Sequence, residues 1–193
     1  MSIKLVLKDV ICSYVYLRQP RESQDGAEPK YSLQIIIDKN DPQVTLIKKA
    51  IADAARSKFG DKIKIGMLKI PLRDGDEERD GDEYKGKYFM NANASQQPQI
   101  VNRFNQPATE QDLDEYCYSG ATYCVSVSVY AFDRPGQKGV ALGLNNVMLR
   151  KKTERLDGRV SATSEFAEFA EKNENDPFSG IDNGSLDDED IDF

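Results

Sequence analysis

The sequence predicts an all-β domain with one main helix, followed by an acidic C-terminal tail. Several stretches alternate apolar and polar residues with the two-residue period of a half-buried strand, and one stretch has helical spacing. Because strands do not alternate with helices along the chain, an OB-fold-like β-barrel fits better than an open α/β sheet. A generic β-sandwich is the alternative that the pattern leaves open.

The first two strands are expected near the N-terminus. Residues 3–17 read as one long strand whose phase changes near Asp9, which indicates a bend or bulge in a strand that serves two sides of a small barrel. A polar loop is expected over residues 19–29. The second strand follows, with an inward-facing set of Tyr31, Leu33, Ile35 and Ile37.

The main helix is expected to begin after Asp41 and to end at Gly60. Asp41 is a typical N-cap residue, and Pro42 suits the first helical position. Its apolar residues recur at helical spacing: Val44, Ile47, Ile51 and Ala55. Further strands are expected over residues 87–94, 99–102, 121–132 and 140–149, and a short helix over residues 164–172.

An acidic stretch at residues 74–83 invites comparison with a calcium-binding loop. The alignment places Lys87 where the loop needs a bidentate glutamate, so we expect a solvated surface loop. A carboxylate–metal nuclease would use Asp74, Asp76, Asp80 and Asp82, but it needs ligands on a rigid scaffold.

Charge is distributed very unevenly along the 193 residues. The chain has a net charge of −7, but residues 165–193 carry eleven acids and one lysine, so the tail is −10 and residues 1–164 are +3. We therefore expect a domain at residues 1–164 and a disordered acidic tail at 165–193. A basic body with an acidic tail suggests that the body has a surface that binds a polyanion and that the tail imitates the charge of this polyanion.

Composition argues against several classes of protein. The chain has no histidine and no CxxC pair, which disfavours a zinc site, a disulfide framework and histidine-dependent catalysis; we expect no cofactor, no metal and no enzyme activity. Cys12, Cys117 and Cys124 are expected to be packing residues. No apolar run approaches the ~20 residues of a membrane span, so we expect a cytoplasmic protein.

Aromatic residues are interleaved with basic and amide residues throughout the body. This is what sequence-independent binding of single-stranded nucleic acid requires, because aromatic faces stack on bases while lysine and arginine neutralise phosphates. By strand phase, Phe89, Tyr130 and Phe132 face outward, although core packing is the alternative for any single aromatic. The candidate DNA-binding residues are Tyr16, Arg18, Lys30, Lys85, Lys87, Phe89, Asn91, Arg103, Phe104, Tyr130, Phe132, Arg134, Lys151 and Lys152.

The last seven residues combine acidic groups with an apolar tip. A docking peptide needs an aromatic anchor and carboxylates that basic residues can hold. The tip resembles the tails of bacterial and phage single-stranded-DNA-binding proteins, although aspartate stands where the bacterial tails have proline. The candidate partner-binding residues are Asp187, Asp188, Glu189, Asp190, Ile191, Asp192 and Phe193.

Four segments of the body resemble a phage family of single-stranded-DNA-binding proteins: residues 118–120, 127–132, 139–147 and 155–159. This family is similar to the replication-associated binding proteins of T7-like phages. The resemblance implies an OB fold and a role in phage DNA replication, recombination and repair in the host cytoplasm. It implies as partners single-stranded DNA, replication proteins such as DNA polymerase, primase or helicase, and further copies of the chain. The alternative is an acidic interaction protein that docks a partner without binding nucleic acid.

Overall fold

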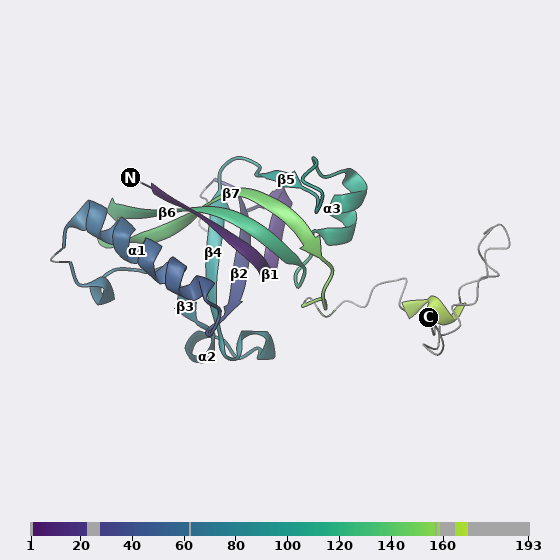
Figure 1. The fold of residues 1–193 in the computed structure, drawn as a ribbon, viewed down its shortest axis with the longest axis horizontal. Helices are drawn as coiled ribbons and strands as arrows, with labels where there is room; N and C mark the ends of the chain where they lie inside the picture. Colours follow the sequence, from purple (N-terminus) through teal and green to yellow (C-terminus); the bar gives the residue numbers. More distant parts are fainter. Residues whose placement is uncertain (1, 23–27, 62, 157, 159–164, 170–193) are drawn as a thin grey trace, which may run out of the picture. The chain divides into compact units, whose positions relative to one another are not determined.

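The computed structural model describes residues 2–22, 28–61, 63–156, 158 and 165–169. The chain divides into two compact units, Met1–Arg159 and Val160–Phe193, which are described separately. In the second unit the described part contains one short 3-10 helix, η3 (Ala167–Phe169). The first unit contains a seven-stranded sheet and the longer helices (Figure 1).

Five of these strands close into a barrel. Neighbours run in the order β1, β2, β4, β7, β6 and back to β1, and the parallel pairing of β4 with β7, at Ala92 and Leu142, closes the ring. This is the strand order of an OB fold, so the predicted OB-fold-like barrel is confirmed. The strands are β1 (Ser2–Arg21), β2 (Lys30–Asp38), β4 (Lys87–Ala94), β6 (Thr122–Arg134) and β7 (Gln137–Lys151).

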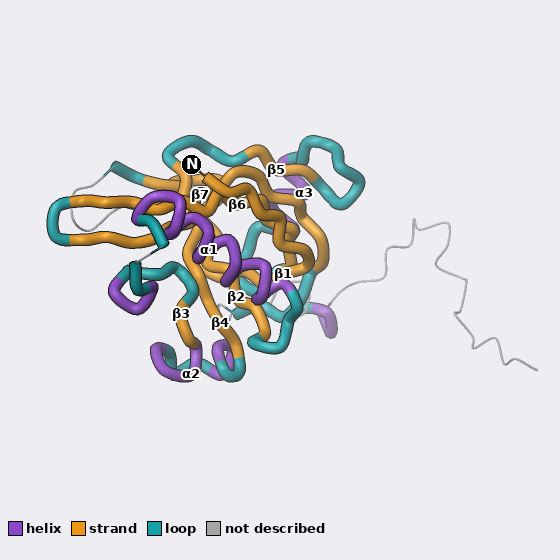
Figure 2. Tube along the Cα trace, turned by 60° about the vertical axis from the view of Figure 1, so that its left-hand side comes forward, coloured by secondary structure: helices purple, strands orange, loops and turns teal. Residues whose placement is uncertain are grey.

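Shorter elements decorate the barrel (Figure 2). Strand β3 pairs with β4, and β5 runs parallel to β7. The bounds of these strands and of the helices are β3 (Arg73–Asp74), β5 (Gln99–Val101), α1 (Gln43–Phe59), α2 (Gly75–Glu78), α3 (Glu110–Tyr116), η1 (Ile65–Met67) and η2 (Asp82–Tyr84). Within the described ranges, none of the helices has the length and apolarity needed to cross a membrane.

Strand β1 contains three register shifts, and two of them are one-residue bulges that let it serve both sides of the barrel. The register gains one residue between Leu7 and Val10, where Asp9 has a φ of 51°, so the predicted irregularity near Asp9 is confirmed. A second residue is gained between Ser13 and Tyr16, where Tyr14 has a φ of 48°. Because of this extra residue, Ser13 and Tyr16 share the outer face although they are three positions apart.

The main core fills the barrel, and α1 packs against it. The predicted apolar face of α1 is buried with the inward residues of the strands: Val44, Ile47, Ile51 and Ala55. Burying each large aliphatic side chain contributes about 1.5–3 kcal/mol. The helix begins one residue later than predicted, with Pro42 instead of Asp41 at the N-cap position; Asp41 still accepts a 2.8 Å hydrogen bond from the backbone nitrogen of Gln43, and Gly60, with a φ of 81°, ends the helix as predicted.

The acidic stretch at residues 74–83 is more ordered than the predicted loop. It contributes β3, α2 and η2, and Asp74 caps α2 by accepting a 3.0 Å hydrogen bond from Asp76. Lys39 lies 2.5 Å from Asp74 and 2.7 Å from Asp76, and these bonds raise the pKa of Lys39. The stretch is therefore fastened to the barrel by an ion pair. The described residues contain no cluster suited to a metal ion.

A smaller apolar cluster lies outside the barrel, on the outer face of β2 and β4. Tyr84 from η2 packs edge-on against Phe89 at 5.4 Å between ring centroids, with Ile36 beside them. The guanidinium groups of Arg73 and Arg79 lie 4.8 and 5.1 Å from the Phe89 ring. The segment from β3 to η2 thus covers part of the face on which OB folds commonly bind their ligands.

Candidate nucleic-acid interface

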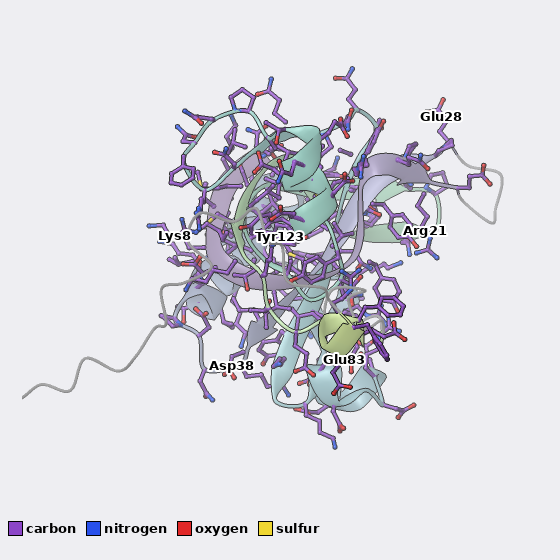
Figure 3. The ribbon with its side chains drawn as sticks, turned by 90° about the vertical axis from the view of Figure 1, so that its right-hand side faces the viewer. Lys8, Arg21, Glu28, Asp38, Glu83 and Tyr123 are labelled. Atoms are coloured by element: carbon purple, nitrogen blue, oxygen red, sulfur yellow. The ribbon has the colours of Figure 1, made fainter. Side chains whose placement is uncertain are left out.

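A groove lies beside the second bulge of β1. Two cavities, of about 640 and 620 Å³, meet at Val15, Tyr16 and Cys117. We call the larger one the tyrosine groove, because its lining includes Tyr14, Tyr16, Tyr84 and Tyr118. In Figure 3, which faces this side of the barrel, Arg21 marks the end of β1 and Glu83 marks η2.

The far wall of the groove is fixed by backbone contacts. The turn at residues 117–121 lies between β1 and the chain that leaves β7. The Tyr14 nitrogen donates to Ser119 Oγ at 3.0 Å, and the Gly120 nitrogen donates to the Cys12 carbonyl at 2.8 Å. Gly120 has a φ of 112°, and a β-carbon there would lie 2.1 Å from the Glu154 carbonyl oxygen, so only glycine fits.

Aromatic rings and guanidinium groups meet in this groove. Tyr14 is 48% exposed, and Arg155 lies 4.4 Å from the centroid of the Tyr118 ring. At the end of β1, Arg21 lies 5.6 Å from the Tyr16 ring. Exposed aromatic faces next to fixed positive charge are the elements that bind a single strand without reading its sequence.

A band of polar side chains crosses the outer face of the sheet next to the groove. Ser13, Gln34 and Asn91 are register partners on β1, β2 and β4, and hydrogen bonds link their side chains. The neighbouring row contains Tyr16, Ser32, Asn93 and Gly143. Asn91 and Asn93 are exposed. Amide groups therefore extend the interface from β1 to β4.

The structure brings only some of the predicted DNA-binding residues together. Tyr16 lines both cavities, Arg18 lines the smaller one, and Asn91 lies in the adjoining polar band. Arg18 is already paired, at 2.8 Å from Glu110 and 2.5 Å from Asp114 of α3. Lys30 lies at the β1–β2 end as the register partner of Arg21.

Phe89 lies on the outer face of the barrel, as its strand phase predicts, but the expectation that its ring is available to stack on bases is wrong. Phe89 does share a strand phase with Lys87 and Asn91, but its side chain is 0% exposed. Tyr84 and two arginines cover the ring, so no base can reach it in this arrangement. Lys87 lies at the same end of β4, and Lys85 forms a 2.5 Å ion pair with Asp82.

Three predicted residues, Arg103, Phe104 and Lys152, lie around α3, and a fourth, Lys151, lies next to Lys152 in the chain. A cavity of about 290 Å³ is lined by Arg103, Phe104 and residues of α3. Lys152 pairs with Glu115 at 2.7 Å and lies 5.2 Å from the Tyr116 ring. Lys151 is exposed at the end of β7.

The remaining three predicted residues lie on the β6–β7 hairpin. Arg134 lies 5.7 Å from the Phe132 ring. A β-carbon at Gly143 would lie 3.6 Å from the ring of Tyr130, so Tyr130 adjoins the row that contains Asn93. The predicted tail residues, Asp187–Phe193, lie outside the described residues.

Sequence reasoning did not select three residues of the groove: Tyr14, Tyr118 and Arg155. Tyr14 has a recognisable signal, because it stands two positions before Tyr16 in a polar-flanked strand. Tyr118 and Arg155 fall in segments that carry the family resemblance, but no local pattern indicates that they touch.

Burial in the wall of the groove raises the pKa of the Cys117 thiol to about 11.

Comparison with known proteins identifies relatives of this chain. A family model described as "Enterobacter phage Enc34, ssDNA-binding protein" matches residues 3–178. The bacteriophage Enc34 single-stranded DNA-binding protein, solved in complex with ssDNA, is 23% identical, with a TM-score of 0.70 over 79% of this chain and 89% of that chain. Its C-terminal truncation is 24% identical, with a TM-score of 0.70 over 79% and 88%.

A more distant structure has the same fold. The single-stranded DNA-binding protein gp2.5 of bacteriophage T7 is 16% identical, with a TM-score of 0.53 over 82% of this chain and 97% of that chain. No curated protein matches the sequence. At these identities the structural matches establish the shared fold, and the family model establishes the relationship.

Proposed function

Because this chain belongs to the phage family of the Enc34 ssDNA-binding protein, we propose that it binds single-stranded DNA without reading the base sequence. The observation that carries the proposal is the tyrosine groove, in which the exposed ring of Tyr14 and the half-buried ring of Tyr16 lie beside the guanidinium group that covers Tyr118. The family is one of binding proteins, and we assign the chain no catalytic role.

The physical basis is stacking combined with phosphate neutralisation. A base stacked on a tyrosine ring contributes about 1–3 kcal/mol, and every base has a π-face, so stacking tolerates any sequence. Arg155 supplies positive charge in the groove, and Arg21 supplies it beside the Tyr16 ring at the end of β1. Release of counterions from the phosphates makes such binding strongly salt-dependent.

The biological role follows from family and charge. The protein coats and protects exposed strands during phage DNA replication, recombination and repair in the cytoplasm of the host bacterium. The acidic tail competes with DNA for the basic surface, and Phe193 anchors a replication protein such as a polymerase, primase or helicase. The support for this role is the −10 charge of residues 165–193 against the +3 body, together with the apolar tip.

A titration of fluorescent oligonucleotides with the full-length chain tests the function. Oligo-dT and a mixed sequence should bind with similar affinity, and added salt should weaken both. Strong preference for one motif would refute sequence-independent binding. No binding at low salt would support the alternative, an acidic protein that docks a partner without nucleic acid.

A further inference from the structure

A buried glutamine controls the orientation of an exposed asparagine on the proposed DNA face. Gln34 lies at an outward position of β2, yet it is only 2% exposed. Its Oε1 atom accepts hydrogen bonds from the hydroxyls of Tyr84, at 2.6 Å, and Ser13, at 3.0 Å. Its Nε2 atom donates to Asn91 Oδ1 at 3.0 Å.

The distances identify which end of the Gln34 amide is oxygen. An O–H···O bond is typically about 2.5–3.0 Å long, whereas N–H···O bonds are about 2.7–3.2 Å. The 2.6 Å contact with Tyr84 matches an oxygen acceptor, in agreement with the orientation that the structure gives the Gln34 amide. With Oε1 facing the two hydroxyls, Nε2 must face Asn91.

The hydrogen bond from Gln34 fixes which end of the Asn91 side-chain amide faces solvent. Its Oδ1 atom is occupied by Gln34, so its Nδ2 group is directed away from the relay. Within the described part of the chain this Nδ2 group has no hydrogen-bond partner, and Asn91 is exposed. The side chain thus presents two unpaired N–H donors, while its Oδ1 atom already accepts one hydrogen bond from Gln34.

We propose that Ser13, Tyr84 and Gln34 form a positioning relay that holds Asn91 as a hydrogen-bond donor to an oxygen of the bound single strand. This inference rests on the proposed function and names one contact within it. Phosphate oxygens and base carbonyl oxygens both accept such a bond. Only a bond to a phosphate oxygen is the same at every nucleotide, because adenine has no carbonyl oxygen, so the phosphate is the acceptor that fits sequence-independent binding.

The first test follows the Asn91 side-chain amide by NMR in ¹⁵N-labelled full-length protein, with Asn91→Ala used to assign the signal. Adding oligo-dT should shift the Asn91 amide protons, while the buried Gln34 amide moves less. An abasic oligonucleotide separates the two acceptors: a shift that persists identifies a phosphate oxygen, and a shift that disappears identifies a base oxygen. An Asn91 amide that does not respond to bound oligo-dT would overturn the proposal.

The second test asks whether the relay acts through Asn91. Asn91→Ala should weaken oligonucleotide binding about five- to tenfold, as expected for a hydrogen bond to a charged or strong acceptor. The double variant Ser13→Ala, Tyr84→Phe removes both hydroxyls and frees the Gln34 amide to rotate, so it should weaken binding by a smaller factor. In the Asn91→Ala background it should have no further effect on affinity.

Asn93→Ala is the matched control, because Asn93 is exposed on the same strand without such a relay. The double variant Ser13→Ala, Tyr84→Phe should weaken oligonucleotide binding by the same factor in the Asn93→Ala background as in the wild-type background. An equal loss in the Asn91→Ala background would instead show a general structural effect and refute the relay. Wild-type protein that binds no oligonucleotide would refute the proposed function itself, which keeps the two failures distinct.

Discussion

Arg18 of β1 donates a 2.8 Å hydrogen bond to Glu110 of α3, at the edge of the smaller cavity. Asp114 also binds this guanidinium, so a cation suited to phosphate is neutralised by the protein itself. Both partners are substantially exposed, and such pairs contribute only about 0–1 kcal/mol to stability. We therefore propose that helix α3 competes with DNA for Arg18.

Neutralising this competitor should strengthen DNA binding. In the double variant Glu110→Gln, Asp114→Asn, affinity for an oligonucleotide at low salt should rise roughly twofold to fivefold, since exposed pairs of this kind are weak. Fluorescence anisotropy measures the change. The control Asp61→Asn, Glu77→Gln removes the same charge from other exposed positions, and an equal gain there would show that only net charge matters.

Phe89 should matter for stability. Phe89→Ala removes a fully buried ring from the cluster with Tyr84 and Ile36, so the free energy of unfolding should fall by about 3–5 kcal/mol. Equilibrium denaturation measures this loss. Phe104→Ala removes a ring that is 68% exposed and should change stability by only about 0.5 kcal/mol. A stable Phe89→Ala protein with weakened DNA binding would contradict the buried position.

Tyr14 should matter for DNA. Tyr14→Ala should weaken oligonucleotide binding by about 1–3 kcal/mol, the contribution of one stacked base, whereas Tyr14→Phe keeps the ring and should bind like the wild type. Tyr14→Gly provides a further check, because glycine adopts the φ of 48° without strain. It should give a folded protein with weakened binding. Unchanged affinity in Tyr14→Gly would exclude stacking at this position.

Cys117 gives a chemical probe of the groove. The thiolate is the reactive form, and burial raises the pKa of Cys117 to about 11, so the thiol stays protonated near neutral pH. Alkylation should be slow at about pH 8 and should keep accelerating beyond the ordinary cysteine pKa of about 8.5. Bound oligonucleotide should slow it further. Mass spectrometry of a Cys124→Ser variant measures the rate, and no protection by DNA would place the strand elsewhere.

Removing the tail should tighten binding at low salt. Deleting residues 187–193 removes five acidic side chains. The gain in affinity should shrink as salt screens the charge, with a Debye length of ~10 Å at 0.1 M. Phe193→Ala keeps those side chains, so it should bind DNA normally while losing partner docking. A truncated chain with unchanged affinity at low salt would refute competition by the tail.

The fold could be predicted because its signals are local. The helical spacing from Val44 to Ala55 and the alternation in β2 specify which side chains enter the core, and the structure buries all of the predicted residues there except Tyr31, which is half-buried outside the core cluster. Helix α3 was missed, although Thr109 and Asp112 form a capping box that the sequence displays. Its seven residues are too few for a clear apolar period, so the cap was the available signal.

The interface was less predictable because it depends on contacts between distant segments. The alternation along β4 correctly separates Phe89 from Met90, but it cannot reveal that Tyr84 covers Phe89. Likewise, Arg155 reaches Tyr118 only because the turn at Gly120 packs against the chain leaving β7. Strand phase assigns a side chain to a face, while burial depends on what packs upon that face.

The double pairing of β1 has a thermodynamic consequence for ligand capture. The strand pairs with β6 through its first half and with β2 through its second, so Ser13 and Tyr16, which flank the groove bulge, belong to the closed hydrogen-bonded ring. Segments within such a ring exchange their amide protons mainly through global unfolding. The two sides of the bulge are therefore preorganised before the ligand arrives. The conformational entropy lost on complex formation falls mainly on the nucleic acid, which is ordered against a template that is already rigid.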